Sequence, residues 1–333
     1  MLFSVVKLQN ICCNDKLSQM FLEEIQRPIK DMLDETSSFI KSDDKSVVEI
    51  IKEIRSMLPI SKGKKIRSTL LFLLSGANNN FSSDLPIIAS SIELFHLSSL
   101  IHDDILDNAI LRRGEKTLNS SMGNLISVLG GDYLFVNSLN LMNGLKNRRF
   151  MDILLNSTSV MVEGQLQEIE NNFNYDIDLE TYLEIISKKT SSLFGAVTRM
   201  SAVSSHENPK IENNFYKFGM DFGNIFQISD DLIDIFSSNS GKGRFRDLEE
   251  GKITLPFILL QKSAAKEDVK RYFSIDRSEK LLELLKLHGI EDKSQERLNV
   301  YYENCMKFLD NFPSSVYRDS LMKLLDFIRF REY

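Results

Sequence analysis

Apolar residues recur along most of the chain three and four positions apart, a spacing typical of amphipathic α-helices. Alternation with a period of two, which would indicate strands, is hard to find. The pattern predicts helices over residues 17–39, 47–58, 64–77, 85–106, 122–145, 150–171, 179–205, 211–236 and 254–264, with shorter ones down to residue 331. The segments between them are rich in Asn, Ser and Gly, as loops are. We therefore expect an all-α protein.

The composition supports this fold class. The 333 residues include only 15 Gly and 6 Pro, too few for a turn-rich sandwich, barrel or propeller. With 42% hydrophobic residues the chain can form a sizeable core, which excludes intrinsic disorder. The length would allow two domains, but there is no long linker and no repeat. We expect a single domain over residues 1–333, built as one large helical bundle.

Charge and cysteine content limit the partners and the compartment. Lys and Arg number 41 against 47 Asp and Glu, so a clustered basic face for nucleic acid is not expected. Cys12, Cys13 and Cys305 have neither zinc-site nor disulfide-framework spacing. No apolar run approaches the roughly 20 residues of a membrane span, and no signal peptide is evident. We expect a soluble, cytoplasmic protein without a transmembrane segment.

Two acidic clusters stand out, each at the end of an apolar helix and each reading Asp-Asp-x-x-Asp. Their members are Asp103, Asp104 and Asp107 in the first cluster and Asp230, Asp231 and Asp234 in the second. Residues four apart share one helix face, where carboxylates repel unless a cation lies between them. Oxygen ligands without histidine favour Mg²⁺. One such cluster is usually a solvated helix end, but two copies indicate a site.

Basic residues are interleaved with these clusters. Gly63, Lys64 and Arg67 come where a loop meets a helix, and a helix N-terminus with two cations can bind an anion. The remaining basic candidates are Arg112, Arg113, Lys188, Lys189 beside Thr190, Lys242 and Lys252. Any one of them alone is more often a solvated patch. Their order along the chain favours a diphosphate site.

One competing interpretation concerns Glu93 and His96, a Glu-x-x-His pair of the kind used in di-iron helical bundles. Such bundles need two of these pairs on separate helices. The chain has 4 His in all, and none forms a second pair. Counting therefore excludes a di-iron site.

With these motifs the sequence resembles the trans-isoprenyl diphosphate synthases, also called polyprenyl synthetases, from about Lys62 to Pro256 and more loosely to the C-terminus. The shared motifs, in the family's order, are Gly63–Arg67, Glu93–Asp107, Arg112–Gly114, Gly131–Leu134, Lys189–Thr190, Phe226–Asp234 and Gly251–Pro256. The resemblance implies an isoprenoid-synthase type bundle around a central apolar cavity. It also implies isopentenyl diphosphate and an allylic diphosphate as substrates and Mg²⁺ as cofactor.

The resemblance also implies a role for each matching residue. The metal-binding set is Asp103, Asp104, Asp107, Asp230 and Asp231, with Asp234 supporting them. The residues implied for the allylic diphosphate are Arg112, Lys189, Thr190, Gln227, Lys242 and Lys252. Those implied for isopentenyl diphosphate are Gly63, Lys64, Arg67, His96 and Arg113. The residues implied to carry catalysis are Asp103, Asp104, Asp107, Lys189 and Asp230.

The product length is less fixed by these motifs. In short-chain members a bulky aromatic about five residues before the first cluster closes the cavity, whereas Ser98 and Ser99 stand here. We therefore expect a long product of the kind attached to respiratory quinones, unless Phe95 or Phe135 closes the cavity elsewhere. Alternatives are a farnesyl or geranylgeranyl synthase, a terpene cyclase, and a non-catalytic subunit of a heteromeric synthase. We also expect a homodimer, with peripheral membrane contact for product release.

Two positions depart from the family pattern. Ser68 stands where proline usually follows the first basic motif. Phe245 replaces a glycine in the loop after the second cluster, a position where positive φ is expected. We expect this loop to differ locally, which makes the role of Lys242 less secure than that of Lys189 or Lys252.

Overall fold

The computed structural model describes residues 15–42, 48–57, 63–112, 114–237, 244–263 and 278–330. Its first helices are α2 (Asp15–Gln26), η1 (Arg27–Ile29), α3 (Lys30–Ser42), α4 (Glu49–Met57), α5 (Ile66–Ala77) and α6 (Leu85–Leu106). A short hairpin, β1 (Leu111–Arg112) and β2 (Glu115–Lys116), follows. The central helices are α7 (Leu118–Met122), α8 (Asn124–Asn143), α9 (Arg149–Glu170), α10 (Leu179–Ile186), η2 (Ser187–Ser191), α11 (Ser192–Ser204) and α12 (Pro209–Phe236). The last are α13 (Arg246–Glu249), α14 (Leu255–Ser263), α16 (Ser278–Leu287), α17 (Ile290–Leu309) and α18 (Val316–Phe330).

The predicted all-α class is confirmed, and α6 has the predicted bounds. Two predicted helices are interrupted. The run over 17–39 contains the 3₁₀ turn η1 at Pro28, because proline lacks the N–H that a helix interior needs. The run over 179–205 contains a π-helical turn, η2, between α10 and α11. Such turns often occur at functional sites.

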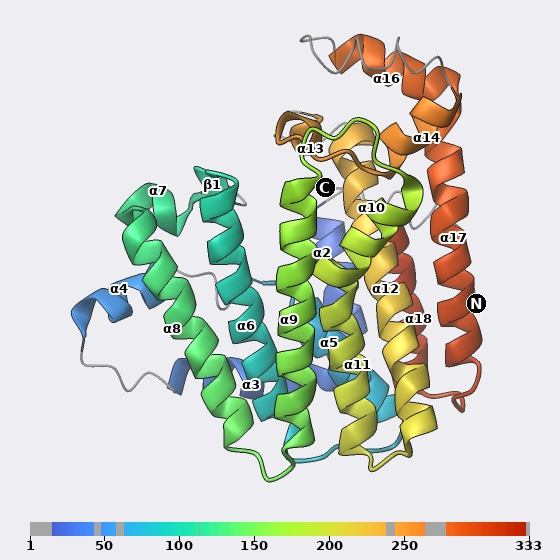
Figure 1. The fold of residues 1–333 in the computed structure, drawn as a ribbon. Helices are drawn as coiled ribbons and strands as arrows, with labels where there is room; N and C mark the ends of the chain where they lie inside the picture. Colours follow the sequence, from blue (N-terminus) through green and yellow to red (C-terminus); the bar gives the residue numbers. More distant parts are fainter. Residues whose placement is uncertain are drawn as a thin grey trace.

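The bundle is layered around helices that are apolar on several faces. In Figure 1, α6 and α8 lie side by side as one pair, next to α9, α11 and α12, while α17 and α18 lie on the far side. Every side chain of α5 except Arg67 is buried, and the same core includes Phe194 on α11 and Phe222 on α12, whose ring centroids are 5.2 Å apart. The expectation of one domain over residues 1–333 stays a prediction.

Among the described residues, α6 and α8 are long and apolar enough to cross a membrane, so the expectation that no stretch reaches that length is not met. Most of the apolar window of α6 is buried in the bundle, as in a core helix, whereas most of that of α8 is not. The absence of a transmembrane segment stays a prediction.

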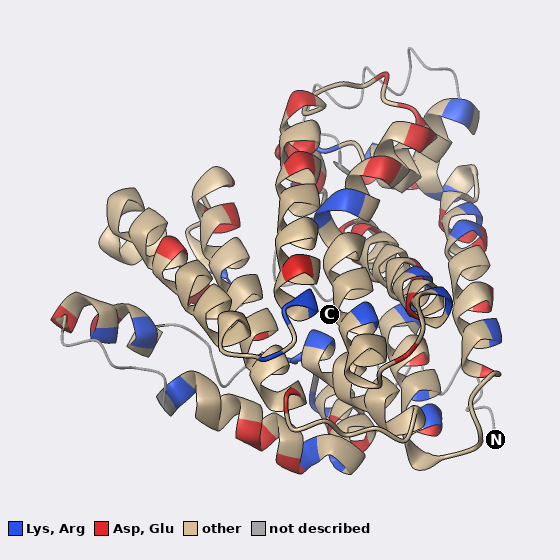
Figure 2. Cartoon of the chain, turned by 60° about the horizontal axis from the view of Figure 1, so that its bottom comes forward, with Lys and Arg blue, Asp and Glu red and all other residues tan. Residues whose placement is uncertain are grey.

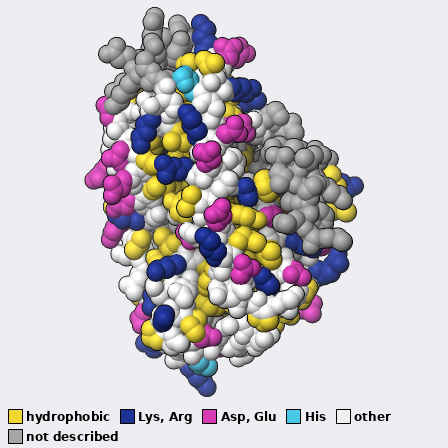
Figure 3. Space-filling view, turned by 90° about the vertical axis from the view of Figure 1, so that its right-hand side faces the viewer, with side chains coloured by type: hydrophobic (Ala, Val, Ile, Leu, Met, Phe, Trp, Pro, Cys, Tyr) yellow, Lys and Arg dark blue, Asp and Glu magenta, His cyan; other side chains and the backbone are white. Residues whose placement is uncertain are grey.

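Both Asp-rich helix ends lie at the same end of the bundle. The C-terminal end of α6 leads into the β1–β2 hairpin, and the C-terminal end of α12 leads toward α13, all at the top of Figure 1. Figure 2 shows acidic positions gathered toward this end, with basic positions close by. On the face shown in Figure 3, basic, acidic and apolar side chains alternate. The fold thus gathers opposite charges at one end, where the motifs predicted them.

Candidate active site

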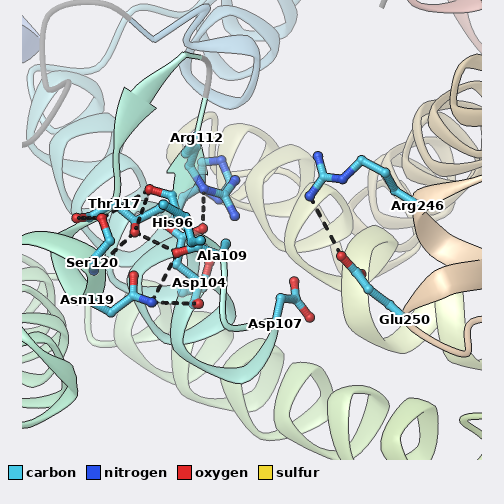
Figure 4. Close-up of polar contacts among 12 residues, drawn as sticks. His96, Asp104, Asp107, Ala109, Arg112, Thr117, Asn119, Ser120, Arg246 and Glu250 are labelled. Atoms are coloured by element: carbon cyan, nitrogen blue, oxygen red, sulfur yellow. Dashed lines mark hydrogen bonds and ion pairs between the residues drawn. The ribbon is translucent and has the colours of Figure 1, made fainter. Parts of the chain in front are cut away.

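The first acidic cluster is held by the hairpin that follows it. Asp104 is only 6% exposed, and its Oδ1 accepts a hydrogen bond from Nε of Arg112 on β1 at 2.7 Å. The amide of Asn119 on α7 donates to the backbone carbonyls of Asp104 and Ala109 at 3.2 and 3.1 Å. Figure 4 shows this network around the end of α6. Arg112, predicted to bind diphosphate, is thereby fixed beside the first cluster.

Asp107 connects this cluster to the loop that follows the second one. Its Oδ1 lies 3.2 Å from Nζ of Lys252, which also lies 2.6 Å from Oε2 of Glu250. Burial alone would lower the pKa of Lys252, but the carboxylates of Glu168, Asp107 and Glu250 outweigh it and raise that pKa. Lys252 is therefore a firmly charged cation between segments far apart in sequence.

Asp103 is the carboxylate of the first cluster whose charge is least compensated. Burial raises its pKa, and the charges of Asp107 and Glu168 raise it further, while Lys189 and Arg112 act in the opposite direction. Lys189 itself forms an ion pair with Glu168 on α9. A desolvated carboxylate next to others gains from a nearby cation, so this environment fits a divalent metal.

In the second cluster, Asp231 is hydrogen-bonded to neutral groups. Asp231 accepts hydrogen bonds from the hydroxyl of Tyr182 and, at 2.9 Å, from Nε2 of Gln227. The hydroxyl of Thr190 donates to Oε1 of Gln227 at 2.8 Å. Burial raises the pKa of Asp231 to about 7, against the effect of the two hydrogen bonds. The half-buried Asp230 acts electrostatically on Asp231 and on Arg67.

Asp234 holds the start of α13. Its carboxylate oxygens accept hydrogen bonds from the backbone N–H groups of Arg246 and Asp247, at 3.2 and 3.4 Å. Its backbone carbonyl accepts from the N–H of Phe245 at 3.2 Å. These bonds give Asp234 a structural role at the start of α13, and the supporting role at the metal that is expected for it stays a prediction.

Phe245 has the positive φ expected at the position of the glycine it replaces, with a value of 66°. The expected local difference between this loop and the family's stays a prediction. The side chain of Phe245 is only 4% exposed, and its ring centroid lies 6.1 Å from that of Phe257. Burial of the ring offsets the roughly 1–2 kcal/mol that this conformation costs an L-residue.

Lys189 and Thr190 reach the site from the π-helical turn η2. Two glycines on neighbouring helices allow these helices to pack closely against this turn. A Cβ at Gly164 on α9 would lie 2.5 Å from the backbone nitrogen of Lys189. A Cβ at Gly223 on α12 would lie 2.4 Å from Cα of Ser191. Both glycines therefore let α9 and α12 close on the turn that carries these residues.

A pocket of about 100 Å³ lies among these elements. Its lining includes the predicted residues Lys189, Thr190, Gln227, Asp231 and Lys252. It also includes Glu168, Tyr182 and Asp247, which the sequence did not single out. Asp247 carries a raised pKa because it is buried near Asp231 and Asp234. The motif spacing contains no signal for these three, since they reach the pocket only through packing.

Three of the residues expected to bind isopentenyl diphosphate, Lys64, Arg67 and His96, lie on or just before α5 and α6. The Arg67 guanidinium lies 4.6 Å from the centroid of the Phe194 ring, and burial lowers its pKa to about 10, opposed by Glu93 and Asp230. Nζ of Lys64 lies 5.7 Å from the centroid of Phe327 on α18. At Gly63 a Cβ would meet nothing within 4 Å, so no steric reason requires glycine there. His96 is half-buried on α6.

Arg113 and Lys242 lie outside the described residues, and their assigned roles stay predictions. Ser98 is 3% exposed, and its hydroxyl donates to the carbonyl of Gly131 on α8 at 2.8 Å. The hydroxyl of Ser99 donates to the carbonyl of His96 at 2.8 Å. Ser98 thus lies in the α6–α8 interface, and the chain-length role of both serines stays a prediction.

The carboxylate oxygens of the two clusters are the kind of ligand that a hard cation such as Mg²⁺ prefers, although they do not point at one common position. Among the described residues, no group of three His, Cys, Asp or Glu side chains is arranged to hold a metal ion. Arg112 and Lys252 are instead paired with Asp104 and Asp107. A bound metal would need these carboxylates to draw together.

Fold and site together define a helical-bundle protein in which two aspartate-rich helix ends lie at one end of the bundle, and Lys252, paired with Asp107 of the first, lines a pocket beside Asp231 of the second. The polyprenyl synthetase family profile matches residues 48–287. The chain belongs to the polyprenyl synthetase family, which confirms the resemblance and the helical fold expected from it.

Three known proteins illustrate the relationship. Heptaprenyl diphosphate synthase component 2 of Bacillus subtilis (strain 168) is 29% identical over 324 residues, which cover 92% of this chain and 93% of that protein. The structure of a decaprenyl diphosphate synthase from Rhodobacter capsulatus has 26% identity and a TM-score of 0.87, covering 94% of this chain and 99% of that one. A polyprenyl synthase from Caulobacter crescentus CB15, complexed with calcium and isoprenyl diphosphate, has 26% identity and a TM-score of 0.87, covering 94% and 98%.

Proposed function

We propose that this protein is a Mg²⁺-dependent prenyltransferase that joins isopentenyl diphosphate to an allylic diphosphate and releases a long trans-polyprenyl diphosphate. The similarity to heptaprenyl and decaprenyl diphosphate synthases over more than nine tenths of the chain supports both the reaction and the long product. The calcium and isoprenyl diphosphate bound by the Caulobacter crescentus relative support a divalent metal and a diphosphate ligand.

The observation that carries this proposal is that the cations acting on the first cluster come from segments beside the second. Lys252, from the loop after the second cluster, lies against Asp107 of the first. Lys189 and Thr190, adjacent in η2, act on Asp103 and Gln227 respectively. Lys189 and Lys252, which act on the first cluster, thus line the same pocket as Asp231 of the second, and this supports a metal–diphosphate site between the two helix ends.

In this proposal, Asp103, Asp104, Asp107, Asp230 and Asp231 hold Mg²⁺. When bound, the metal withdraws electron density from the leaving diphosphate and so favours ionisation of the allylic C–O bond.

The cations of the chain then perform two tasks, and the side chains around them a third. Lys189, Lys252 and Arg112 stabilise the negative charge that develops on the diphosphate. Lys64 and Arg67 hold isopentenyl diphosphate. Burial of the surrounding side chains excludes water from the reacting carbons, which protects a carbocation from hydrolysis.

The cavity that receives the growing chain is part of the same proposal. The rings of Phe95 on α6 and Phe135 on α8 have centroids 5.9 Å apart. Phe95 precedes Asp103 by about two helical turns, or about 12 Å of helix rise. This pair is the candidate end of the cavity if the product is short, the alternative that the long-chain relatives do not favour.

The assembly and location expected from the sequence are also proposals. Exposed Leu125, Leu129 and Val136 on α8 favour burial against another chain, and we propose a homodimer. The component 2 designation of the Bacillus subtilis relative makes a heteromeric assembly the second candidate. The free thiol of the buried Cys305 is compatible with the reducing cytoplasm that we propose. Product release at a membrane surface remains part of the proposal.

The test is to incubate the purified full chain with labelled isopentenyl diphosphate, an allylic primer and Mg²⁺, and to size the products. Chains longer than geranylgeranyl are expected, and they should disappear when the metal is chelated. Absence of any elongation would refute the transferase proposal. Products that stop at farnesyl or geranylgeranyl would leave the reaction intact and refute the long-chain assignment.

A further inference from the structure

The carboxylate of Glu93 on α6 caps the first turn of α5. Its Oε1 accepts hydrogen bonds from the hydroxyl of Ser68 at 2.6 Å and from the backbone N–H of Ser68 at 3.3 Å. The residue before α5, Lys65, has φ of 49° and makes no side-chain cap. The first N–H groups of a helix have no partner within it, so Glu93 supplies a cap from a neighbouring helix.

The same carboxylate acts on the cations at this helix end. Burial lowers the pKa of Lys65 and of Arg67, and Glu93 is the strongest opposing influence on each. Beyond Glu93, Arg67 also feels the charge of Asp230 in the second cluster. Glu93 therefore links the cap of α5 to the cation that faces the acidic end of the bundle.

The segment before α5 is fixed from other sides as well. Nε2 of Gln26 donates to the carbonyl of Lys64 at 2.9 Å and to the hydroxyl of Thr69 at 2.8 Å. The ammonium group of Lys65 donates to the hydroxyl of Ser37. Because the N–H of Ser68 is already bonded to Glu93, one N–H fewer of this helix end can bind a diphosphate, which gives more weight to the side chains of Lys64 and Arg67. Their direction depends on how the first turn is held.

Ser68 occupies the place where proline usually stands in the family. Proline has neither a hydroxyl nor an N–H, so it could make neither bond to Glu93. We propose that Glu93 and Ser68 are positioning residues, which fix the first turn of α5 so that Arg67 is directed at the diphosphate of isopentenyl diphosphate. This inference rests on the proposed prenyl-transfer function and deepens it, because it concerns one of the two substrates.

The test compares Ser68→Ala, Ser68→Pro, Glu93→Gln and the double variant Ser68→Ala/Glu93→Gln in the Mg²⁺-loaded full chain. Loss of a hydrogen bond to a charged group predicts about a tenfold rise in KM for isopentenyl diphosphate, with kcat and KM for the primer within about twofold. The double variant should lose less than the sum of the two single variants, since the two residues form one interaction. Calorimetric titration with isopentenyl diphosphate alone should show the same weakening.

Ser75→Ala is the matched control. Ser75 lies on the same helix, and its buried hydroxyl is 2.8 Å from that of Ser201. This variant should lower the melting temperature without changing either KM. If Ser68→Ala and Glu93→Gln behave in the same way as the control, their role is structural and the inference is overturned. A fall in KM, or an equal rise for both substrates, would also overturn it.

The two proposals fail in distinguishable ways. A wild-type protein that binds isopentenyl diphosphate but never elongates a primer would refute the proposed function, while the titrations would still decide the role of Glu93.

Discussion

The two Asp-Asp-x-x-Asp clusters have the same letters and opposite surroundings. In the first, Asp104 and Asp107 are each paired with a cation, Arg112 or Lys252. In the second, Asp231 is bonded to Tyr182 and Gln227, and Asp234 to backbone N–H groups. Identical motifs thus have different contacts. Two carboxylates of the first cluster are neutralised by cations, whereas Asp234 of the second holds the start of the segment that carries Lys252.

This difference explains why the second cluster is more tightly bound into the fold. Burial raises the pKa of Asp231, Asp234 and Asp247 together, and each of the three lies near the others. Neutral donors stabilise a buried carboxylate less than a cation does. A divalent metal would therefore reduce the repulsion between carboxylates in the second cluster and at Asp103, whereas at Asp104 and Asp107 it would replace cations already present.

The largest expected effect is on turnover in the first cluster. Asp103→Ala should reduce elongation by at least about 10³-fold, because it removes a carboxylate that is proposed to bind the metal and that, unlike Asp234, does not hold a neighbouring segment. Asp234→Asn should reduce it only about tenfold and should lower the melting temperature, since one oxygen can still accept from α13. Product assays and thermal unfolding of both variants check this contrast.

Equal loss of turnover in Asp103→Ala and Asp234→Asn would contradict the division between the clusters. Near-normal turnover in Asp103→Ala would contradict the metal-binding role itself.

The second effect concerns the turn that serves both clusters. Lys189→Ala should reduce kcat about 100-fold, because Lys189 lines the pocket and its charge acts on Asp103. Its neighbour Lys188 is the matched control: Nζ of Lys188 lies 2.7 Å from Oε1 of Glu184 in a partly exposed pair. Lys188→Ala should change kcat by less than about twofold. Steady-state kinetics decide, and similar losses in both variants would count against the pocket assignment of Lys189.

The spacing of residues along the chain was enough to predict the helices and the residues that share a helix face. The bounds of α6 and the joint position of Asp103 and Asp107 follow from helical spacing. Spacing could not show that Asp234 bonds backbone groups, or that Tyr182 reaches Asp231, because both depend on packing between separate segments. Phe245 shows the same limit, since its conformation depends on the ring of Phe257.

The third effect tests that loop through its stability. Phe245→Ala should destabilise the protein by about 3–5 kcal/mol, because a buried ring is lost. Phe245→Gly should be less harmful by about 1 kcal/mol, because glycine adopts positive φ without strain. At the partner ring the order should reverse: Phe257 lies within α14, where glycine is worse than alanine by roughly 0.5–1 kcal/mol. Denaturant unfolding of the four variants checks both orders, and a common order at both sites would disprove the conformational argument.

The smallest effect concerns the pH dependence of the free energy of unfolding, which depends on the carboxylates of the second cluster. The folded-state pKa of Asp231 is raised to about 7, above an unfolded value near ~3.9. Between these values the folded chain binds more protons than the unfolded one, so the metal-free protein should lose stability as pH rises from about 4 through about 7. Asp231→Asn should remove the part of this loss that comes from Asp231, leaving the part due to Asp234 and Asp247. Unfolding free energies measured in chelator across this range test it.

An unchanged slope in Asp231→Asn would mean that the buried carboxylate is not the group that titrates. Saturating Mg²⁺ should flatten the wild-type slope, because a cation binds the deprotonated form and raises stability most where that form prevails.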